Sequence, residues 1–168
     1  MKLELKKLKE KRWVWLILSL SSAILIAIAY YFQHVVGLEP CFLCIVQRIA
    51  IIIIGIASFL LFITPSNIVN KIISNLLYYV GAVGGLFAAS RQVYMQHNPD
   101  PVASCGPGFE YILENSPLTE ALPKLFLATG NCSEVTWTFA SLSMAEWMIP
   151  IFLGYIIVNL VVNIRKAV

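Results

Sequence analysis

Four predominantly apolar blocks, each roughly twenty residues long, constrain this chain more than any other feature of its sequence. They cover about 13–32, 45–63, 72–90 and 145–164. A helix of about 20 residues crosses the hydrocarbon core of a bilayer and satisfies its own backbone hydrogen bonds, whereas membrane barrel strands need only about 10 residues. The composition agrees, because 59% of the residues are hydrophobic and 12% are charged, far from the balance of a soluble domain. The sequence therefore predicts an all-α membrane protein built as a four-transmembrane-helix bundle.

The distribution of basic residues orients these blocks, because lysine and arginine near membrane helices gather on the cytoplasmic side. One side of the blocks carries only Arg91 and Lys124. The other side, formed by both chain ends and the connection between the second and third blocks, carries Lys2, Lys6, Lys7, Lys9, Lys11, Arg12, Lys71, Arg165 and Lys166. We therefore expect both termini in the cytoplasm and two outward loops, about 33–44 and 91–144. The net charge of +3 is then a topology signal and does not indicate nucleic-acid binding.

The N-terminal segment before the first block has two interpretations. Leu3, Leu5 and Leu8 alternate with its lysines, so it could lie as an amphipathic helix against anionic membrane lipids, or it could be a solvated basic tail. The first block is longer than the hydrophobic region of a signal peptide, about 7–15 residues, and no small-x-small cleavage pattern follows it. We expect this block to be retained as a membrane span.

All four cysteines fall on the outward side or at the membrane edge beside it. They are Cys41, Cys44, Cys105 and Cys132. Free cysteines usually behave as small buried hydrophobic residues and would be scattered through the helices. This one-sided placement therefore argues for an oxidising compartment and for two cysteine pairs.

The pair Cys41 and Cys44 forms a CxxC motif that follows Pro40 and opens the second apolar block. Two cysteines three residues apart at a helix start can bond, and the exposed amides and positive dipole end of the helix stabilise a thiolate there. Arg48 lies one helical turn beyond Cys44, on the same face. A charge inside a membrane helix costs several kcal/mol and indicates function. The alternative for Arg48 is that its side chain reaches back to the outer interface.

The second pair, Cys105 and Cys132, brackets most of the long outward loop. As a structural disulfide it would stabilise the loop by roughly 3 kcal/mol, but the neighbouring CxxC favours a redox role. A zinc site would normally need two tight ligand pairs, which the second pair does not provide. A c-type haem is disfavoured because Ile45 stands where its attachment motif needs histidine.

A protein that makes disulfides must pass two electrons onward. The sequence has no GxGxxG motif, no paired membrane histidines for haem and no further cysteines for an iron-sulfur cluster. By elimination, the expected electron acceptor is a lipid-soluble quinone. Cys44 is the cysteine nearer the hydrocarbon, and Arg48 could stabilise charge on a quinone oxygen. Arg91, Gln92 and Gln96 leave the third block at the same membrane face, where an apolar pocket with a few polar groups would suit a cofactor.

The run 41–48, Cys-Phe-Leu-Cys-Ile-Val-Gln-Arg, resembles the CxxCxxxR signature of the DsbB family, the disulfide bond formation proteins of bacterial inner membranes. The likeness continues through Arg91-Gln92 with Gln96, Ser104-Cys105-Gly106, Gly130-Asn131-Cys132 and Met144 to Trp147. It implies a single DsbB-like membrane domain over 1–168 with its redox cysteines on the periplasmic side. It also implies that the chain reoxidises the periplasmic thiol oxidase DsbA and passes electrons to ubiquinone, or to menaquinone when oxygen is scarce.

The resemblance also implies a role for each cysteine. Cys105 would form the mixed disulfide with DsbA, Cys132 would exchange with Cys41, and Cys44 would reduce the quinone with the help of Arg48. One position departs from the family pattern, because some well-known members carry histidine where Gln92 stands here. A proton-donating role is therefore not assumed for Gln92, and paralogues that serve a dedicated partner instead of a general DsbA remain an alternative.

Two rival functions remain open at the level of sequence. A protein like vitamin K epoxide reductase also couples a membrane CxxC to a quinone, but its CxxC is expected after the other cysteine pair, whereas Cys41 and Cys44 come first here. A membrane scaffold with purely structural periplasmic disulfides is the rival outside the enzymes. It gives no reason for Arg48 to stand beside a CxxC.

Overall fold

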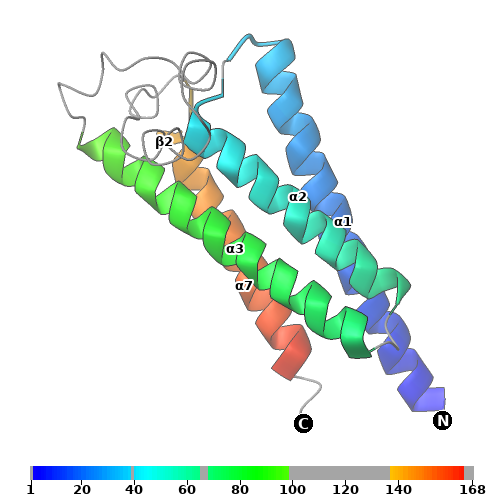
Figure 1. Ribbon diagram of the computed structural model, residues 1–168. Coiled ribbons are helices and arrows are strands. Elements are labelled where there is room, and N and C mark those ends of the chain that lie inside the picture. The colour runs from blue at the N-terminus through cyan, green and yellow to red at the C-terminus, as the bar shows by residue number, and fades with distance from the viewer. Residues whose placement is uncertain (1, 39, 65–67, 99–136, 165–168) are drawn as a thin grey trace, which may run out of the picture.

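The computed structural model describes residues 2–38, 40–64, 68–98 and 137–164, which form a bundle of four long helices (Figure 1). The helices are α1 (Lys2–His34), α2 (Phe42–Ile63), α3 (Ile68–His97) and α7 (Met144–Ile164), and the short strands β1 (Thr138–Phe139) and β2 (Leu142–Ser143) precede α7. Each helix contains a stretch that is long and apolar enough to cross a membrane. The predicted four-transmembrane-helix bundle is therefore confirmed.

The helices pack in the order in which they occur in the chain: α1 against α2, α2 against α3, and α3 against α7. Glycines allow the close approach of α3 to both of its neighbours. A Cβ atom on Gly81 would lie 2.9 Å from the Ala50 carbonyl oxygen of α2. A Cβ atom on Gly85 would lie 2.2 Å from the ring of Phe152 on α7. Small residues at helix contacts are typical of membrane bundles, where packing replaces the hydrophobic drive.

Polar side chains join helices that are distant in sequence. The Tyr155 hydroxyl on α7 lies 2.8 Å from the Ser21 hydroxyl and 3.2 Å from that of Ser22, both on α1. The Tyr78 hydroxyl on α3 donates a hydrogen bond of 2.9 Å to the Tyr155 carbonyl. Such bonds contribute about 0.6 kcal/mol each in a membrane on average. Together they tie α1, α3 and α7 at one level of the bundle.

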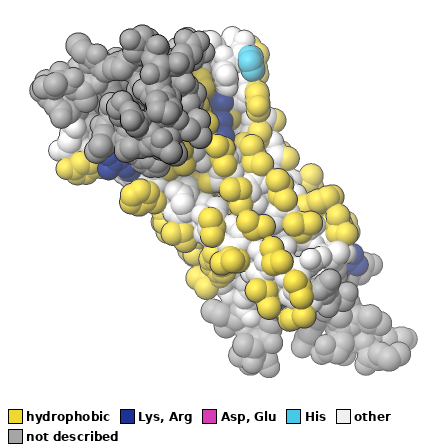
Figure 2. Space-filling view, in the orientation of Figure 1, with side chains coloured by type: hydrophobic (Ala, Val, Ile, Leu, Met, Phe, Trp, Pro, Cys, Tyr) yellow, Lys and Arg dark blue, Asp and Glu magenta, His cyan; other side chains and the backbone are white. Residues whose placement is uncertain are grey.

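The outer surface of the bundle suits contact with lipid. Large apolar side chains are exposed along all four helices, and in Figure 2 hydrophobic side chains cover most of the visible helical surface, with basic side chains toward its two ends. In water such a surface would be an aggregation hazard. In a bilayer it is the surface that makes the helices soluble in hydrocarbon.

A tight hairpin leads into α7. Strands β1 and β2 pair antiparallel, and the two connecting residues, Ala140 and Ser141, have φ values of 53° and 67°. The helix then begins with a capping box: the Glu146 amide donates to the Ser143 hydroxyl, and the Ser143 amide donates to the Glu146 carboxylate over 2.6 Å. This reciprocal pair satisfies two amides that a helix start otherwise leaves unpaired. The Ser143 hydroxyl also donates to Gln96 on α3, which holds the start of α7 beside the end of α3.

Candidate functional site

The CxxC pair lies at the beginning of α2, and one of its sulfurs takes part in the helix cap. Cys41 is the N-cap residue with extended backbone angles, and its sulfur accepts a hydrogen bond of 3.3 Å from the Cys44 amide. Cys41 Sγ also donates to Cys44 Sγ over 2.8 Å. Both sulfurs therefore lie at the positive end of the helix dipole, as the spacing predicts.

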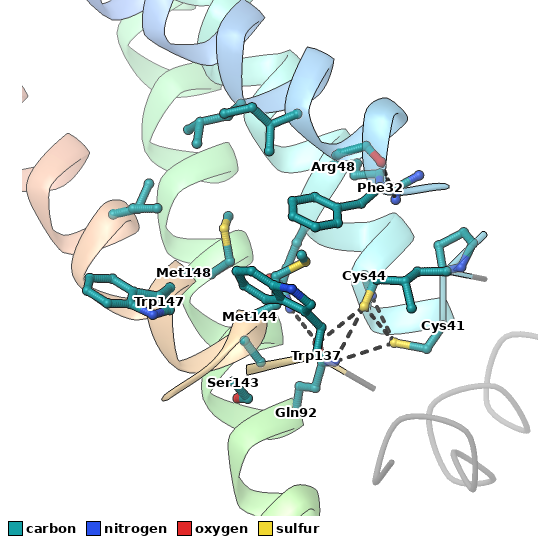
Figure 3. Close-up of a pocket in the computed structure, with 18 of the residues that line it drawn as sticks. Phe32, Cys41, Cys44, Arg48, Gln92, Trp137, Ser143, Met144, Trp147 and Met148 are labelled. Carbon is teal, nitrogen blue, oxygen red and sulfur yellow. Dashed lines mark hydrogen bonds between the residues drawn. The ribbon is translucent and has the colours of Figure 1, made fainter. Parts of the chain in front are cut away.

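One buried glutamine, Gln92, contacts both sulfurs, and a second, Gln47, contacts Gln92. Gln92 on α3 donates through Nε2 to Cys44 Sγ at 3.4 Å and to Cys41 Sγ at 3.5 Å (Figure 3). Its Oε1 accepts a hydrogen bond of 2.8 Å from Nε2 of Gln47 on α2. The Cys44 thiol in turn donates to Gln92 Oε1 over 3.7 Å. Gln92 therefore links the cysteine pair to the interior of the bundle.

Arg48 lies one turn beyond Cys44 and is held by α1. Its guanidinium donates through Nη1 to the side-chain oxygen of Gln33. It also donates through Nη2 to the Ala29 carbonyl over 3.3 Å. These two acceptors reduce the cost of placing a charge in the bundle. One of the two acceptors, Gln33, lies near the outward end of α1, so these contacts are compatible both with a charge held beside the cavity and with a side chain that reaches toward the outer interface.

A cavity of about 360 Å³ opens between the helices beside the cysteines. Its wall is mainly apolar, with Leu25, Ile28, Ile51 and Met148 among the contributors. The predicted site residues in this wall are Cys41, Cys44, Arg48, Gln92 and Gln96. An apolar cavity with a few convergent polar groups is the usual form of a small-molecule site.

Aromatic side chains connect α1 to α7 along one wall of this cavity. The ring centroids of Phe32 and Trp137 are 5.0 Å apart, and Trp137 stacks on Phe139 at 6.0 Å. Phe139 in turn contacts Trp147 at 6.2 Å, and the Trp147 indole donates a 3.0 Å hydrogen bond to the Phe139 carbonyl. The hairpin before α7 therefore contributes rings to the same space as the cysteines (Figure 3).

The structure brings together five of the seven predicted site residues, while Cys105 and Cys132 lie outside the described residues. Gln96 is turned toward Ser143, the last residue of β2 before α7, because its Oε1 accepts a hydrogen bond of 2.8 Å from the Ser143 hydroxyl. Arg91, expected on the same membrane face, is not among the residues that line the cavity. The roles of all seven, and the pairings Cys41–Cys44 and Cys105–Cys132, stay predictions.

Sequence reasoning missed most of the aromatic and several of the polar contributors, of which Gln33, Gln47 and Trp137 are instructive. Gln47 and Gln33 were passed over, although a glutamine within or just after an apolar membrane block is itself a signal, because an unpaired amide there is costly. Trp137 carries no such signal, since a tryptophan in a long loop is equally typical of a membrane interface. Its position depends on tertiary contact with Phe32.

Comparisons with known proteins agree on one family. The family model described as "Disulfide bond formation protein DsbB" matches residues 11–162. A protein named "Disulfide bond formation protein B" from Polaromonas sp. is 38% identical over 156 residues, covering 93% of this chain and 92% of that protein. Proteins of the same name from Pasteurella multocida and Shewanella amazonensis are 37% and 40% identical, covering 96% and 87% of this chain and 90% and 86% of their own lengths.

Proposed function

This chain belongs to the DsbB family of disulfide bond formation proteins, and from that premise we propose that it is a protein-dithiol:quinone oxidoreductase of the bacterial inner membrane. In this proposal it reoxidises a periplasmic DsbA-type thiol oxidase and passes the electrons through two cysteine pairs to the membrane quinone pool. One observation carries the quinone half of the proposal. Cys44 lies in the wall of an apolar cavity inside a bundle of membrane-spanning helices.

The proposed orientation places both termini in the cytoplasm and the loops of about 33–44 and 91–144 in the periplasm, within one domain over 1–168. The basic residues of the sequence support it, because all but two of those that flank the apolar blocks lie on the side of the termini. The cysteine end of the bundle then meets the periplasm, where thiol oxidases work.

The cavity fits the head of a quinone. Its volume of about 360 Å³ lies within the range of about 300–1,000 Å³ typical of small-molecule sites. The rings of Phe32 and Trp137 offer flat apolar contact, while Arg48 and Gln92 supply hydrogen-bond donors near Cys44. When bound, a quinone would accept two electrons and two protons. We propose ubiquinone as the acceptor and menaquinone as its alternative.

The proposed relay conserves two electrons at each exchange. Cys105 and Cys132 begin as a disulfide, which the partner's dithiol reduces while the partner becomes oxidised. The Cys132 thiolate then attacks Cys41, which forms a Cys132–Cys41 bond and releases the Cys44 thiolate. Cys105 next attacks Cys132 in this bond and releases the Cys41 thiolate, so that the Cys105–Cys132 bond is restored and Cys41 and Cys44 are both reduced. Each step forms one S–S bond and breaks another, with a thiolate as nucleophile and a thiolate as leaving group. Both cysteines line the cavity, and Cys44 is proposed as the last donor because it lies further along α2, nearer the hydrocarbon.

Arg48 and Gln92 have distinct proposed roles at this last step. Arg48 supplies a fixed positive charge beside the cavity, which favours negative charge developing on an acceptor oxygen. Gln92 donates to the sulfur of Cys44 and so favours its thiolate. Neither role requires Gln92 to release a proton.

The test is quinone reduction, followed by absorbance, when the purified protein is mixed with a reduced DsbA-type protein and ubiquinone in detergent or lipid. We expect wild type to turn over and Cys44→Ser to lose turnover by at least about a thousandfold, since a hydroxyl cannot replace a thiolate in the exchange. Ser58→Ala is the matched control, because Ser58 is buried on the same helix away from the cavity. It should turn over like wild type.

The alternative functions give different results in this assay. A membrane scaffold with structural periplasmic disulfides would reduce no quinone, and Cys44→Ser would change only its stability. A protein serving a dedicated partner would stay inactive with a general DsbA but would reduce quinone when supplied with a small dithiol. Inactivity of a folded wild-type sample with both dithiol sources and both quinones would refute the proposal.

A further inference from the structure

A single hydrogen bond between two buried glutamines lies behind the cysteine pair. Gln47 on α2 and Gln92 on α3 are each 5% exposed. Gln47 donates through Nε2 to Gln92 Oε1 at 2.8 Å, the shortest polar contact that either glutamine makes among those described. We infer that Gln47 is a positioning residue that sets which end of the Gln92 carboxamide faces the two sulfurs. The inference rests on the proposed function and deepens it.

The orientation of a carboxamide decides what it can do for a sulfur. Its NH₂ end donates two hydrogen bonds, and its oxygen only accepts. With the NH₂ end toward the cysteines, Gln92 reaches Cys44 Sγ at 3.4 Å and Cys41 Sγ at 3.5 Å. These bonds favour a thiolate over a thiol, because hydrogen bonds to a charged acceptor are the stronger kind. With the oxygen toward the cysteines, only an S–H group would be favoured.

The two ends of the carboxamide have almost the same shape, so packing alone does not distinguish them. The donor of Gln47 does distinguish them. It must find an acceptor in the buried interior, and Gln92 Oε1 supplies one. Turning Gln92 alone would place its NH₂ group against the NH₂ group of Gln47 and leave a buried donor unsatisfied, which is costly. In the observed arrangement Gln47 therefore holds the donor end of Gln92 on the sulfurs, at 3.4 and 3.5 Å, with the Gln92 oxygen more distant at 3.7 Å from Cys44 Sγ.

The consequence concerns the redox equilibrium of the Cys41–Cys44 pair. A contact that favours the thiolate stabilises the reduced pair and makes the disulfide a stronger oxidant. Loss of the Gln47 donor leaves Gln92 able to present either end. The oxidised pair should then be favoured relative to the reduced pair.

The experiment measures the equilibrium of the pair with glutathione in full-length protein whose Cys105 and Cys132 are replaced by alanine. Thiols are trapped by alkylation and counted by mass spectrometry, with no quinone or partner protein present. Gln47→Met keeps the side-chain length and removes both polar atoms. We expect the equilibrium constant for reduction to fall about tenfold, which for a two-electron couple corresponds to about 30 mV. Ser58→Ala should leave it unchanged.

A double-variant cycle distinguishes positioning from a general structural effect. Gln92→Met should lower the constant by at least as much as Gln47→Met. Adding Gln47→Met to Gln92→Met should then change it less than twofold, because the group that Gln47 positions is gone. A full tenfold effect of Gln47→Met in the Gln92→Met background would overturn the inference, as would an unchanged constant in Gln47→Met alone.

Quinone turnover of the same single variants, measured with the periplasmic cysteines intact, keeps the two hypotheses apart. If Gln47→Met shifts the glutathione equilibrium only when Gln92 is present, but wild type reduces no quinone, the positioning role of Gln47 stands and the proposed enzyme activity is refuted. If wild type reduces quinone, but Gln47→Met shifts the glutathione equilibrium equally with and without Gln92, the proposed enzyme activity stands and the positioning role of Gln47 is refuted.

Discussion

The contact between Gly85 on α3 and Phe152 on α7 gives a quantitative test of how the bundle is packed. A methyl group added at position 85 would lie 2.2 Å from the nearest ring carbon, whereas carbon atoms are comfortable at about 3.5–4.0 Å. The ring or the helix must therefore move by about 3.5 − 2.2 = 1.3 Å. Phe152 is fully buried, so its ring has no open space to enter.

The neighbouring glycine supplies the matched control. A methyl group at Gly84 would meet nothing within 4 Å, and alanine is favoured over glycine in a helix by about 1 kcal/mol. Overpacking a tight core costs about 1–3 kcal/mol. Both variants share this helix-propensity gain, so it cancels between them. We therefore expect Gly85→Ala to be less stable than Gly84→Ala by about 1–3 kcal/mol, the cost of overpacking alone.

The assay is reversible unfolding in mixed detergent micelles, followed by circular dichroism in parallel for wild type and the two variants. Adding Phe152→Leu to Gly85→Ala should recover part of the lost stability, since a smaller side chain makes room for the methyl group. Equal stability of Gly85→Ala and Gly84→Ala would refute the packing argument. So would a Phe152→Leu substitution that lowers the stability of Gly85→Ala as much as it lowers that of wild type.

Three further changes test the site and its supports. Arg48→Lys keeps the charge but loses the forked contact with Gln33 and the backbone, so the KM for quinone should rise about tenfold; an unchanged KM in steady-state kinetics would contradict this. Ser143→Ala removes the α7 cap and should cost about 1 kcal/mol in the same unfolding assay. Trp147→Phe removes the indole hydrogen bond to Phe139, and we expect faster hydrogen exchange in the hairpin, with no change at the start of α2.

The membrane helices were predictable because the length of an apolar span must match the thickness of the bilayer. The residues at which the helices begin and end were less predictable. α3 continues past the apolar block through Gln92 to His97, since backbone hydrogen bonding does not stop where lipid contact stops. The hairpin before α7 carries no Asn-Gly or Asp-Gly signal for its turn. Its two positive-φ positions hold Ala140 and Ser141, so local sequence preference is overridden there by tertiary contacts.

The candidate site was likewise predictable only in part. The position of Cys44 and Arg48 on one helical face follows from spacing alone, and Gln92 was predictable at the same membrane face. Gln33 and Gln47 could have been noted as polar residues at or within apolar blocks, but their pairing with Arg48 and Gln92 was not predictable. Pairwise contacts between helices depend on rotation about each axis, which the composition of a block does not specify.

The cap of α2 links chemistry to folding through one atom. Cys41 Sγ accepts the hydrogen bond of the Cys44 amide, and the proposed relay requires the same sulfur to bond covalently to Cys132. Each time it does so, the first turn of α2 must keep or surrender that acceptor, at a cost of up to about 1 kcal/mol, the usual worth of a cap. Return of Cys41 to the cap position would recover that hydrogen bond. The start of α2 therefore favours, by up to about 1 kcal/mol, the arrangement in which Cys41 lies beside Cys44.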